Sequence, residues 1–137
     1  MNNECNIHHS LFIVLNSPFT FLLMAIISSH VLDSVIGDHA KNIRIACFRL
    51  ASTQREAVFD VIANEQGRIA EQITAQAGEQ YELVFHTAAY FAAQPNMPDG
   101  RQIIHEVVVR FDIPNPDERI HIPLMLSPHS YSVWWSA

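Results

Sequence analysis

Three residues stand out by their type and local context: His30, Arg68 and His121. His30 ends an apolar segment, Arg68 follows a glycine at the start of another, and His121 lies between two isoleucines. A neutral imidazole suits general-base work, because its ordinary pKa lies close to neutral pH. A second imidazole can orient the first or carry a proton, and a guanidinium offers paired donors to a carbonyl or a developing oxyanion. Together these groups could activate water for attack on a carbonyl carbon.

Each of the three also has a plainer interpretation. His30 could be a surface residue at a strand end, Arg68 could form a salt bridge in a turn, and His121 could be a sheet histidine with satisfied hydrogen bonds. Successive side chains of a strand point to opposite faces. If the two isoleucines beside His121 face the core, His121 lines the other surface of the sheet. We expect the remaining histidines to face solvent: His8, His9, His39, His86, His105 and His129.

The elements that must position these residues are short strands separated by polar turns. The alternation of apolar residues predicts strands over 25–32, 43–50, 56–63, 68–73, 81–87, 103–113, 120–126 and 131–135. Residues 88–94 contain two pairs of alanines and no β-branched residue, which favours a short helix. This pattern predicts an all-β fold: an eight-stranded antiparallel β-sandwich with one short helix after the fifth strand.

Composition limits the classes of function. The 137 residues fit one domain, and a net charge of −6 argues against a nucleic-acid partner, which would need a basic patch. The two cysteines, Cys5 and Cys47, provide no disulfide framework. The histidines and cysteines show no zinc-binding spacing, so no metal site is predicted.

The N-terminal residues differ from the rest. We expect residues 1–23 to be an extension or leader outside the fold, and 24–137 to form one domain. The apolar stretch 11–29 is broken at Asn16-Ser17-Pro18, so it predicts no stable membrane span. It lacks the basic start of a signal peptide, although Ser28-Ser29 could imitate a cleavage site. We therefore expect a cytoplasmic protein, with export as the alternative and Met24 as an alternative start.

Several motifs, in their order and spacing, resemble the transthyretin-related family, whose enzymatic branch is 5-hydroxyisourate hydrolase. They cover roughly residues 25–132. The motifs are Ser29-His-Val-Leu-Asp33, Gly37, Gly67-Arg68, Tyr90-Phe91 and His121-Ile-Pro-Leu-Met-Leu-Ser127.

The resemblance implies a homotetramer of eight-stranded sandwiches, with sites in the groove between dimers. Two histidines and an arginine line that groove in the hydrolases, and they match His30, His121 and Arg68. The hormone-carrying branch has replaced these polar residues, so their presence favours the enzymatic branch. The implied reaction is hydrolytic opening of a cyclic amide ring in urate breakdown. The substrate is a small molecule, and the reaction needs no metal or cofactor.

The C-terminus departs from the family pattern. The hydrolases end in Tyr-Arg-Gly-Ser, whereas this chain ends in Trp134-Trp135-Ser136-Ala137. The site wall thereby loses a phenol and a cation and gains two aromatic faces. We expect Ser132, Trp134 and Trp135 to contact the substrate; alternatively, the two tryptophans only seal a contact between subunits.

Three functions remain open on the sequence. The first is a divergent 5-hydroxyisourate hydrolase that keeps the two histidines and the arginine. The second is a related enzyme that uses the same groups on another, more aromatic cyclic substrate. The third is a non-catalytic protein that binds a small ligand.

Overall fold

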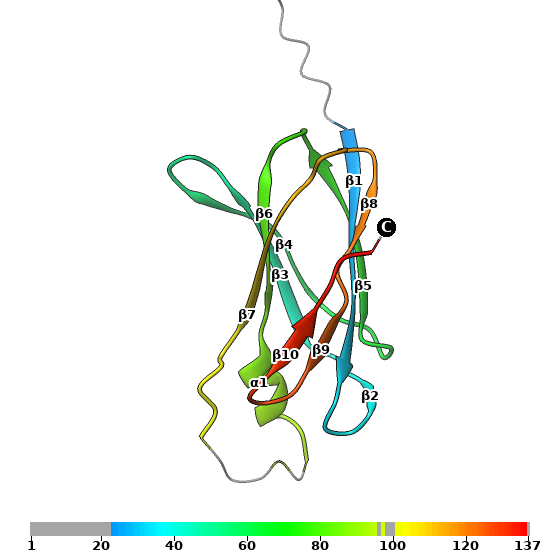
Figure 1. Ribbon diagram of the computed structural model, residues 1–137, viewed down its shortest axis with the longest axis vertical. Helices are drawn as coiled ribbons and strands as arrows, with labels where there is room; N and C mark the ends of the chain where they lie inside the picture. The colour runs from blue at the N-terminus through cyan, green and yellow to red at the C-terminus, as the bar shows by residue number, and fades with distance from the viewer. Residues whose placement is uncertain (1–22, 96, 98–100, 137) are drawn as a thin grey trace, which may run out of the picture.

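Two β-sheets face each other in the computed structural model, which describes residues 23–95, 97 and 101–136 (Figure 1). One sheet contains β1 (Leu23–Asp33), β2 (Asp38–His39), β5 (Arg68–Ala75), β8 (Arg119–His121), β9 (Leu124–Leu126) and β10 (Tyr131–Val133). The other contains β4 (Arg55–Ile62), β3 (Arg44–Leu50), β6 (Gln80–Phe85) and β7 (Val107–Asp112), in that spatial order. The helix α1 (Thr87–Ala92) lies at one end of the sandwich (Figure 1).

The predicted β-sandwich is confirmed, with one difference: some of its strand pairs are parallel rather than antiparallel. β1 is the centre of its sheet and pairs antiparallel with β5, but parallel with β8 and β9. The chain crosses from β7 in the second sheet to β8 in the first, and it enters beside β1 in the same direction. β1 therefore has a neighbour on each side along most of its length, which makes it a rigid support for side chains on its outer face.

Some predicted boundaries are wrong for local reasons. The strand expected over 103–113 covers only Val107–Asp112, because the carbonyl of His105 accepts hydrogen bonds from the start of α1 instead of from a strand. The strand expected over 120–126 is divided into β8 and β9 at Pro123, which has no amide hydrogen to donate. α1 is six residues long, and no helix in the described ranges is long and apolar enough to cross a membrane.

The N-terminal boundary lies largely outside the described residues. Of the segment 1–23, expected to be an extension or leader, only Leu23 is described, as the first residue of β1.

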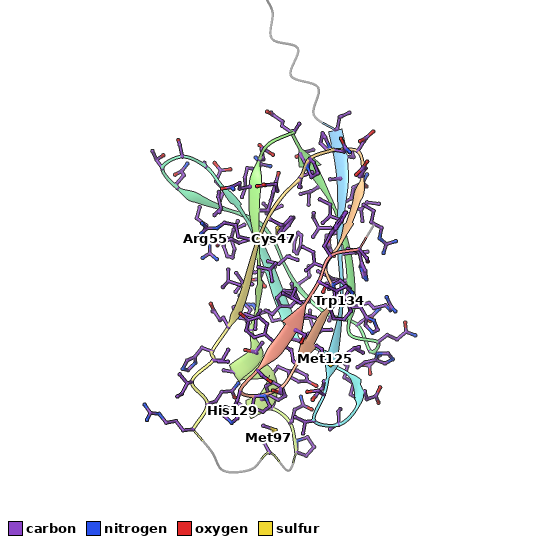
Figure 2. The ribbon with its side chains drawn as sticks, in the orientation of Figure 1. Cys47, Arg55, Met97, Met125, His129 and Trp134 are labelled. Carbon is purple, nitrogen blue, oxygen red and sulfur yellow. The ribbon has the colours of Figure 1, made fainter. Side chains whose placement is uncertain are left out.

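The space between the sheets is filled by alternate side chains of the strands. Fully buried residues from both sheets meet there, among them Ile27, Val31, Tyr81, Leu83 and Phe85. Cys47 is buried in the same core (Figure 2), and burial raises the pKa of its thiol to about 12. Its thiolate is therefore strongly disfavoured, which excludes Cys47 as a nucleophile at neutral pH.

A buried hydrogen bond ties the helix to the end of β1. The Tyr90 hydroxyl donates to Asp33 Oδ2 over 2.8 Å, and the Val35 amide donates to Asp33 Oδ1 over 2.8 Å. Asp33 and Tyr90 are both motif residues, and this contact gives them a structural role. They fix the turn that follows the strand carrying His30.

Candidate active site

Three adjacent strands bring His30, Arg68 and His121 to one face of the first sheet. Arg68 on β5 lies directly opposite His30 on β1, and His121 on β8 lies beside Ser28 on β1. Ser28 and His30 are two residues apart, so their side chains share a face. The isoleucines on both sides of His121 are buried, which confirms that His121 faces away from the core. The strand pairing thus gathers three residues that lie far apart in the sequence.

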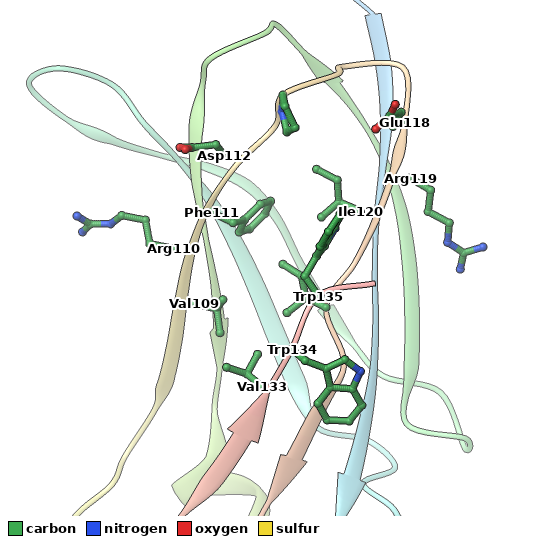
Figure 3. A pocket seen from close by; sticks show the side chains of 12 residues that line it. Val109, Arg110, Phe111, Asp112, Glu118, Arg119, Ile120, Val133, Trp134 and Trp135 are labelled. Atoms are coloured by element: carbon green, nitrogen blue, oxygen red, sulfur yellow. The ribbon is translucent and has the colours of Figure 1, made fainter. Parts of the chain in front are cut away.

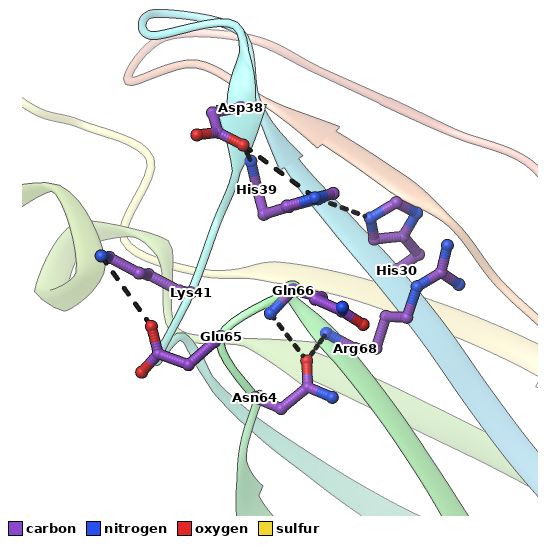
Figure 4. Close-up of polar contacts among 8 residues, drawn as sticks. All are labelled: His30, Asp38, His39, Lys41, Asn64, Glu65, Gln66 and Arg68. Atoms are coloured by element: carbon purple, nitrogen blue, oxygen red, sulfur yellow. Dashed lines mark hydrogen bonds and ion pairs between the residues drawn. The ribbon is translucent and has the colours of Figure 1, made fainter.

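The turn before β5 fixes Arg68. The Asn64 side-chain oxygen accepts hydrogen bonds from the amides of Gln66 (2.9 Å) and Arg68 (3.0 Å), as Figure 4 shows. Gly67 has a positive φ of 67°, and a Cβ there would collide with the Val31 carbonyl. A glycine is required because the turn packs directly against β1. Arg68 consequently enters its strand at a fixed register beside His30.

Ser28 is the hydrogen-bond partner that orients His121. Its hydroxyl oxygen lies 2.9 Å from His121 Nδ1 and accepts a 3.0 Å hydrogen bond from Arg119 Nε. Its other contact, to the Ile120 carbonyl, is longer at 3.4 Å. Since the hydroxyl has a single hydrogen, the short contact favours donation to His121 Nδ1. The hydrogen of neutral His121 then resides on Nε2, which is free to donate to a ligand.

His30 has an imidazole partner that the sequence did not identify. His30 Nε2 lies 3.0 Å from His39 Nδ1, and the two rings are 5.1 Å apart between centroids (Figure 4). His39 was expected to face solvent, and this expectation is wrong in part. Its side chain is 41% exposed, but β2 pairs with β1 and brings the ring against His30. Only the return of the chain after Gly37 creates this contact, which no spacing rule signals.

Burial and nearby positive charge keep both imidazoles neutral. The pKa of His30 is lowered first by burial, then by the charge of Arg68 and by the charges that His39 and His121 would carry if protonated, while a hydrogen bond to the Gln66 backbone opposes the shift. The pKa of His121 is lowered by burial and by the charges of Arg119 and Arg68. Two neutral imidazoles beside a guanidinium provide a base, a hydrogen-bond donor and a cation in one place.

A hollow of about 250 Å³ adjoins this cluster. It is lined by Ser29, Asn64, Arg68, Ile69, Ala70 and Arg119. The two arginines make it suitable for the carbonyl oxygens or negative charge of a small polar ligand. Within the described ranges, no three His, Cys, Asp or Glu side chains are grouped to hold a metal ion.

The C-terminal segment continues the sheet beside β9 and β8. Ser132 pairs with Met125, and Ser136 forms a bridge with His121. This register places Ser132 and Trp134 on the outer face with His121, and Trp135 on the opposite face. Trp134 is 46% exposed and Trp135 is 67% exposed. Ala137, the last of the four altered residues, lies outside the described ranges.

Trp135 instead lines a second pocket, at the open side between β7 and the C-terminal segment (Figure 3). This pocket has a volume of about 540 Å³, and its walls include Val109, Phe111 and Ile120. Trp134 also borders it. Of the three residues expected to contact substrate, the structure therefore brings Ser132 and Trp134 to the face that carries His121, but not Trp135.

Comparison with known proteins identifies the family of the chain. Residues 27–135 match the model of the HIUase/Transthyretin family. The chain belongs to this family. The resemblance in the motifs is thereby confirmed over most of the sequence.

Two curated family relatives are similar over nearly their whole length. The protein named 5-hydroxyisourate hydrolase 2 from Rhizobium meliloti (strain 1021) is 36% identical over 112 residues, which cover 79% of this chain and 92% of the relative. The 5-hydroxyisourate hydrolase of Pseudomonas aeruginosa is 32% identical over 116 residues, covering 81% and 90% of the two chains.

Two solved structures share the family fold. The crystal structure of (S)-allantoin synthase superposes with a TM-score of 0.74 and 30% identity over 86% of this chain, but this chain spans only 46% of that protein. The 5-hydroxyisourate hydrolase of Klebsiella pneumoniae gives a TM-score of 0.67 over 82% of this chain and 99% of that one. At 24% identity, the second comparison supports the fold alone.

Proposed function

We propose that this family member hydrolyses 5-hydroxyisourate, opening a cyclic amide ring in urate breakdown. The main observation in support is the cluster of His30, Arg68 and His121 on the outer face of β5, β1 and β8. The names and coverage of the relatives support the same reaction. A carrier of apolar ligands would gain nothing from two neutral imidazoles and a guanidinium on one face.

Within this proposal, each of the three side chains has a role. His30 accepts a proton from water as the water attacks the ring carbonyl, because its lowered pKa keeps the imidazole neutral. Arg68 donates to the carbonyl oxygen as negative charge develops there. His121 donates from Nε2 to the substrate, because the Ser28 hydroxyl donates to Nδ1 and leaves the ring hydrogen on Nε2. The carbonyl carbon then forms a bond to the water oxygen, and the ring carbon–nitrogen bond breaks.

Assembly into a homotetramer is part of this proposal. The face that carries the cluster also exposes Met24, Ile26, Met125 and Trp134. Exposed apolar side chains of this number typically mark a protein or ligand contact. Family membership indicates a small-molecule ligand and an oligomer, and a tetramer would bring two such faces together into a groove. Light scattering during gel filtration measures the mass; a monomer at working concentration would contradict this part.

Trp134 supports a second candidate, hydrolysis of a more aromatic cyclic substrate. Its indole lies on the same face as His121 and is 46% exposed. An aromatic ring would stack there more favourably than a small polar one.

The deciding experiment adds purified protein to freshly generated 5-hydroxyisourate and follows the decay of its ultraviolet absorbance. We expect acceleration over buffer in proportion to enzyme concentration. An unchanged decay would reject the hydrolase proposal. Quenching of tryptophan fluorescence by aromatic ligands, without turnover, would then indicate a binding protein.

A further inference from the structure

We propose that His39 is a positioning residue that relays a proton between His30 and solvent. The proposal rests on the hydrolase function proposed above and adds to it a residue outside the cluster of three. Its basis is the 3.0 Å contact between His30 Nε2 and His39 Nδ1, together with the 41% exposure of the His39 side chain.

The position of His39 follows from β2. Leu32 on β1 pairs with His39, so the two side chains lie on the outer face that also carries His30. The His39 amide donates to Asp38 Oδ1 over 2.7 Å, which fixes the backbone of this short strand. The imidazole is therefore held against His30 by strand pairing and by its own backbone contact.

The direction of the hydrogen bond between the two imidazoles suits transfer of a proton from His30 to His39. Asp38 Oδ1 lies 4.0 Å from His39 Nε2, and a carboxylate on that side favours a hydrogen on Nε2. Protonated His30 carries a hydrogen on both ring nitrogens, so its Nε2 donates to His39 Nδ1 while the hydrogen bond to the Gln66 backbone is kept. A proton entering at His39 Nδ1 releases the hydrogen at Nε2 to water, because 41% of this side chain is exposed.

The reaction requires such an exit. When water opens a cyclic amide, the carbonyl carbon gains a hydroxyl group and the ring nitrogen gains the second hydrogen of the water. The new carboxylic acid ionises at neutral pH, so one proton leaves the site in each turnover. Handing it to His30 alone would leave an imidazolium beside Arg68, which the charge on that guanidinium disfavours. Transfer through His39 returns His30 to its neutral form.

Other charged groups near the pair do not offer the same path. Arg68 from β5, and His121 from β8 when it is protonated, act on His30 through their charges, and Asp38 is adjacent to His39 on β2. The Lys41–Glu65 ion pair joins the two neighbouring loops at 3.9 Å (Figure 4). Of the groups with a described contact to the His30 ring nitrogens, only His39 can both accept a proton and release one to water.

Two substitutions of His39 distinguish a role in proton transfer from a role in packing against His30. His39→Gln keeps a polar side chain against His30 but cannot carry a proton, and His39→Ala leaves room for added imidazole. In weakly buffered solution we expect both to lower kcat about tenfold with KM little changed, because a group that transfers a proton directly contributes about a hundredfold or more and His39 acts only through His30. Added imidazole should restore the alanine variant but not the glutamine variant. The matched control is His105→Gln, at an exposed histidine just before β7 of the other sheet, which should behave as wild type.

The proposal is overturned if His39→Gln retains the wild-type kcat, or if imidazole fails to restore His39→Ala. A measurement without substrate distinguishes this failure from failure of the hydrolase function. NMR of nitrogen-15-labelled protein should show that the His30 ring N–H hydrogen exchanges with water more slowly in His39→Gln than in wild type. Equal exchange rates would reject the relay, whether or not the protein hydrolyses 5-hydroxyisourate.

Discussion

The polar cluster and the C-terminal edge are built on neighbouring strands of one sheet, yet they are held very differently. His30, Arg68 and His121 each have a defined partner or a fixed turn: His39, the Asn64 turn and Ser28. Trp134 is held by a backbone hydrogen bond to the Pro123 carbonyl, Trp135 lies between it and the bridge of Ser136 with His121, and both residues are exposed. The polar groups are therefore pre-organised within one chain, whereas the two tryptophans are held less firmly and remain exposed.

This contrast indicates which part of the site can change without loss of catalysis. Pre-organised donors and bases contribute most to catalysis, because they need no rearrangement when charge develops. A wall residue mainly determines which ligand fits. We therefore expect substitutions in the cluster to reduce turnover strongly, and substitutions in the aromatic edge to alter substrate binding and assembly.

The largest effect is expected from His121→Ala. Removing the imidazole deletes the donor that Ser28 orients, and kcat/KM for 5-hydroxyisourate should fall by about a hundredfold or more. Stopped-flow absorbance measures the rate, and His105→Ala is the control for loss of a surface histidine. Activity within a few-fold of wild type would place His121 outside the mechanism.

Arg68→Lys should have the next largest effect. A lysine keeps the charge but loses the planar pair of donors, so we expect kcat/KM to fall by roughly ten- to a hundredfold. Thermal unfolding should change little, because the Asn64 side chain accepts from the backbone amide at this position. Full activity in the lysine variant would mean that position 68 contributes only charge.

Activity should decline in acid with an inflection below the ordinary histidine pKa. Burial and Arg68 lower the pKa of His30, and its neutral form is the active one. Protonation therefore begins only at lower pH, after which the rate falls about tenfold for each further pH unit. The measurement is kcat/KM against pH at constant ionic strength. An inflection above the free-histidine value of about 6.5 would contradict the lowered pKa.

The smallest effects should distinguish the two tryptophans. Trp134→Tyr reshapes the face that carries His121, and we expect KM to change by a few-fold, about 1 kcal/mol or less. Trp135→Phe acts in the pocket between β7 and the C-terminal segment, so it should shift the melting temperature or the subunit equilibrium more than KM. Equal effects of the two substitutions on KM would contradict the placement of Trp134 and Trp135 on opposite faces of the sheet.

Strand patterning predicted the sandwich and the outward direction of His121, because alternation of side chains is a local property. It did not predict where strands stop. The segment 103–106 is apolar enough for a strand, but His105 gives its carbonyl to the start of α1. Pro123 was a visible interruption in the sequence, and the structure converts it into a break between two strands.

The motif residues predicted a site of two histidines and an arginine, and the fold brings all three together. The same reasoning assigned His39 to solvent and grouped Trp135 with Trp134. His39 lies nine residues after His30, and its contact exists only because β2 folds back along β1. The two tryptophans are adjacent in sequence, and strand geometry sends them to opposite faces.

The sequence alone determined the strand-rich class, the family and the chemical types available for catalysis, since these depend on residue identity and short-range spacing. The tertiary structure decided which groups touch: His39 with His30, Ser28 with His121, and Trp135 with the apolar pocket. The physical reason is strand register. Shifting a pairing by one residue leaves composition and motifs unchanged but sends every side chain of that strand to the other face.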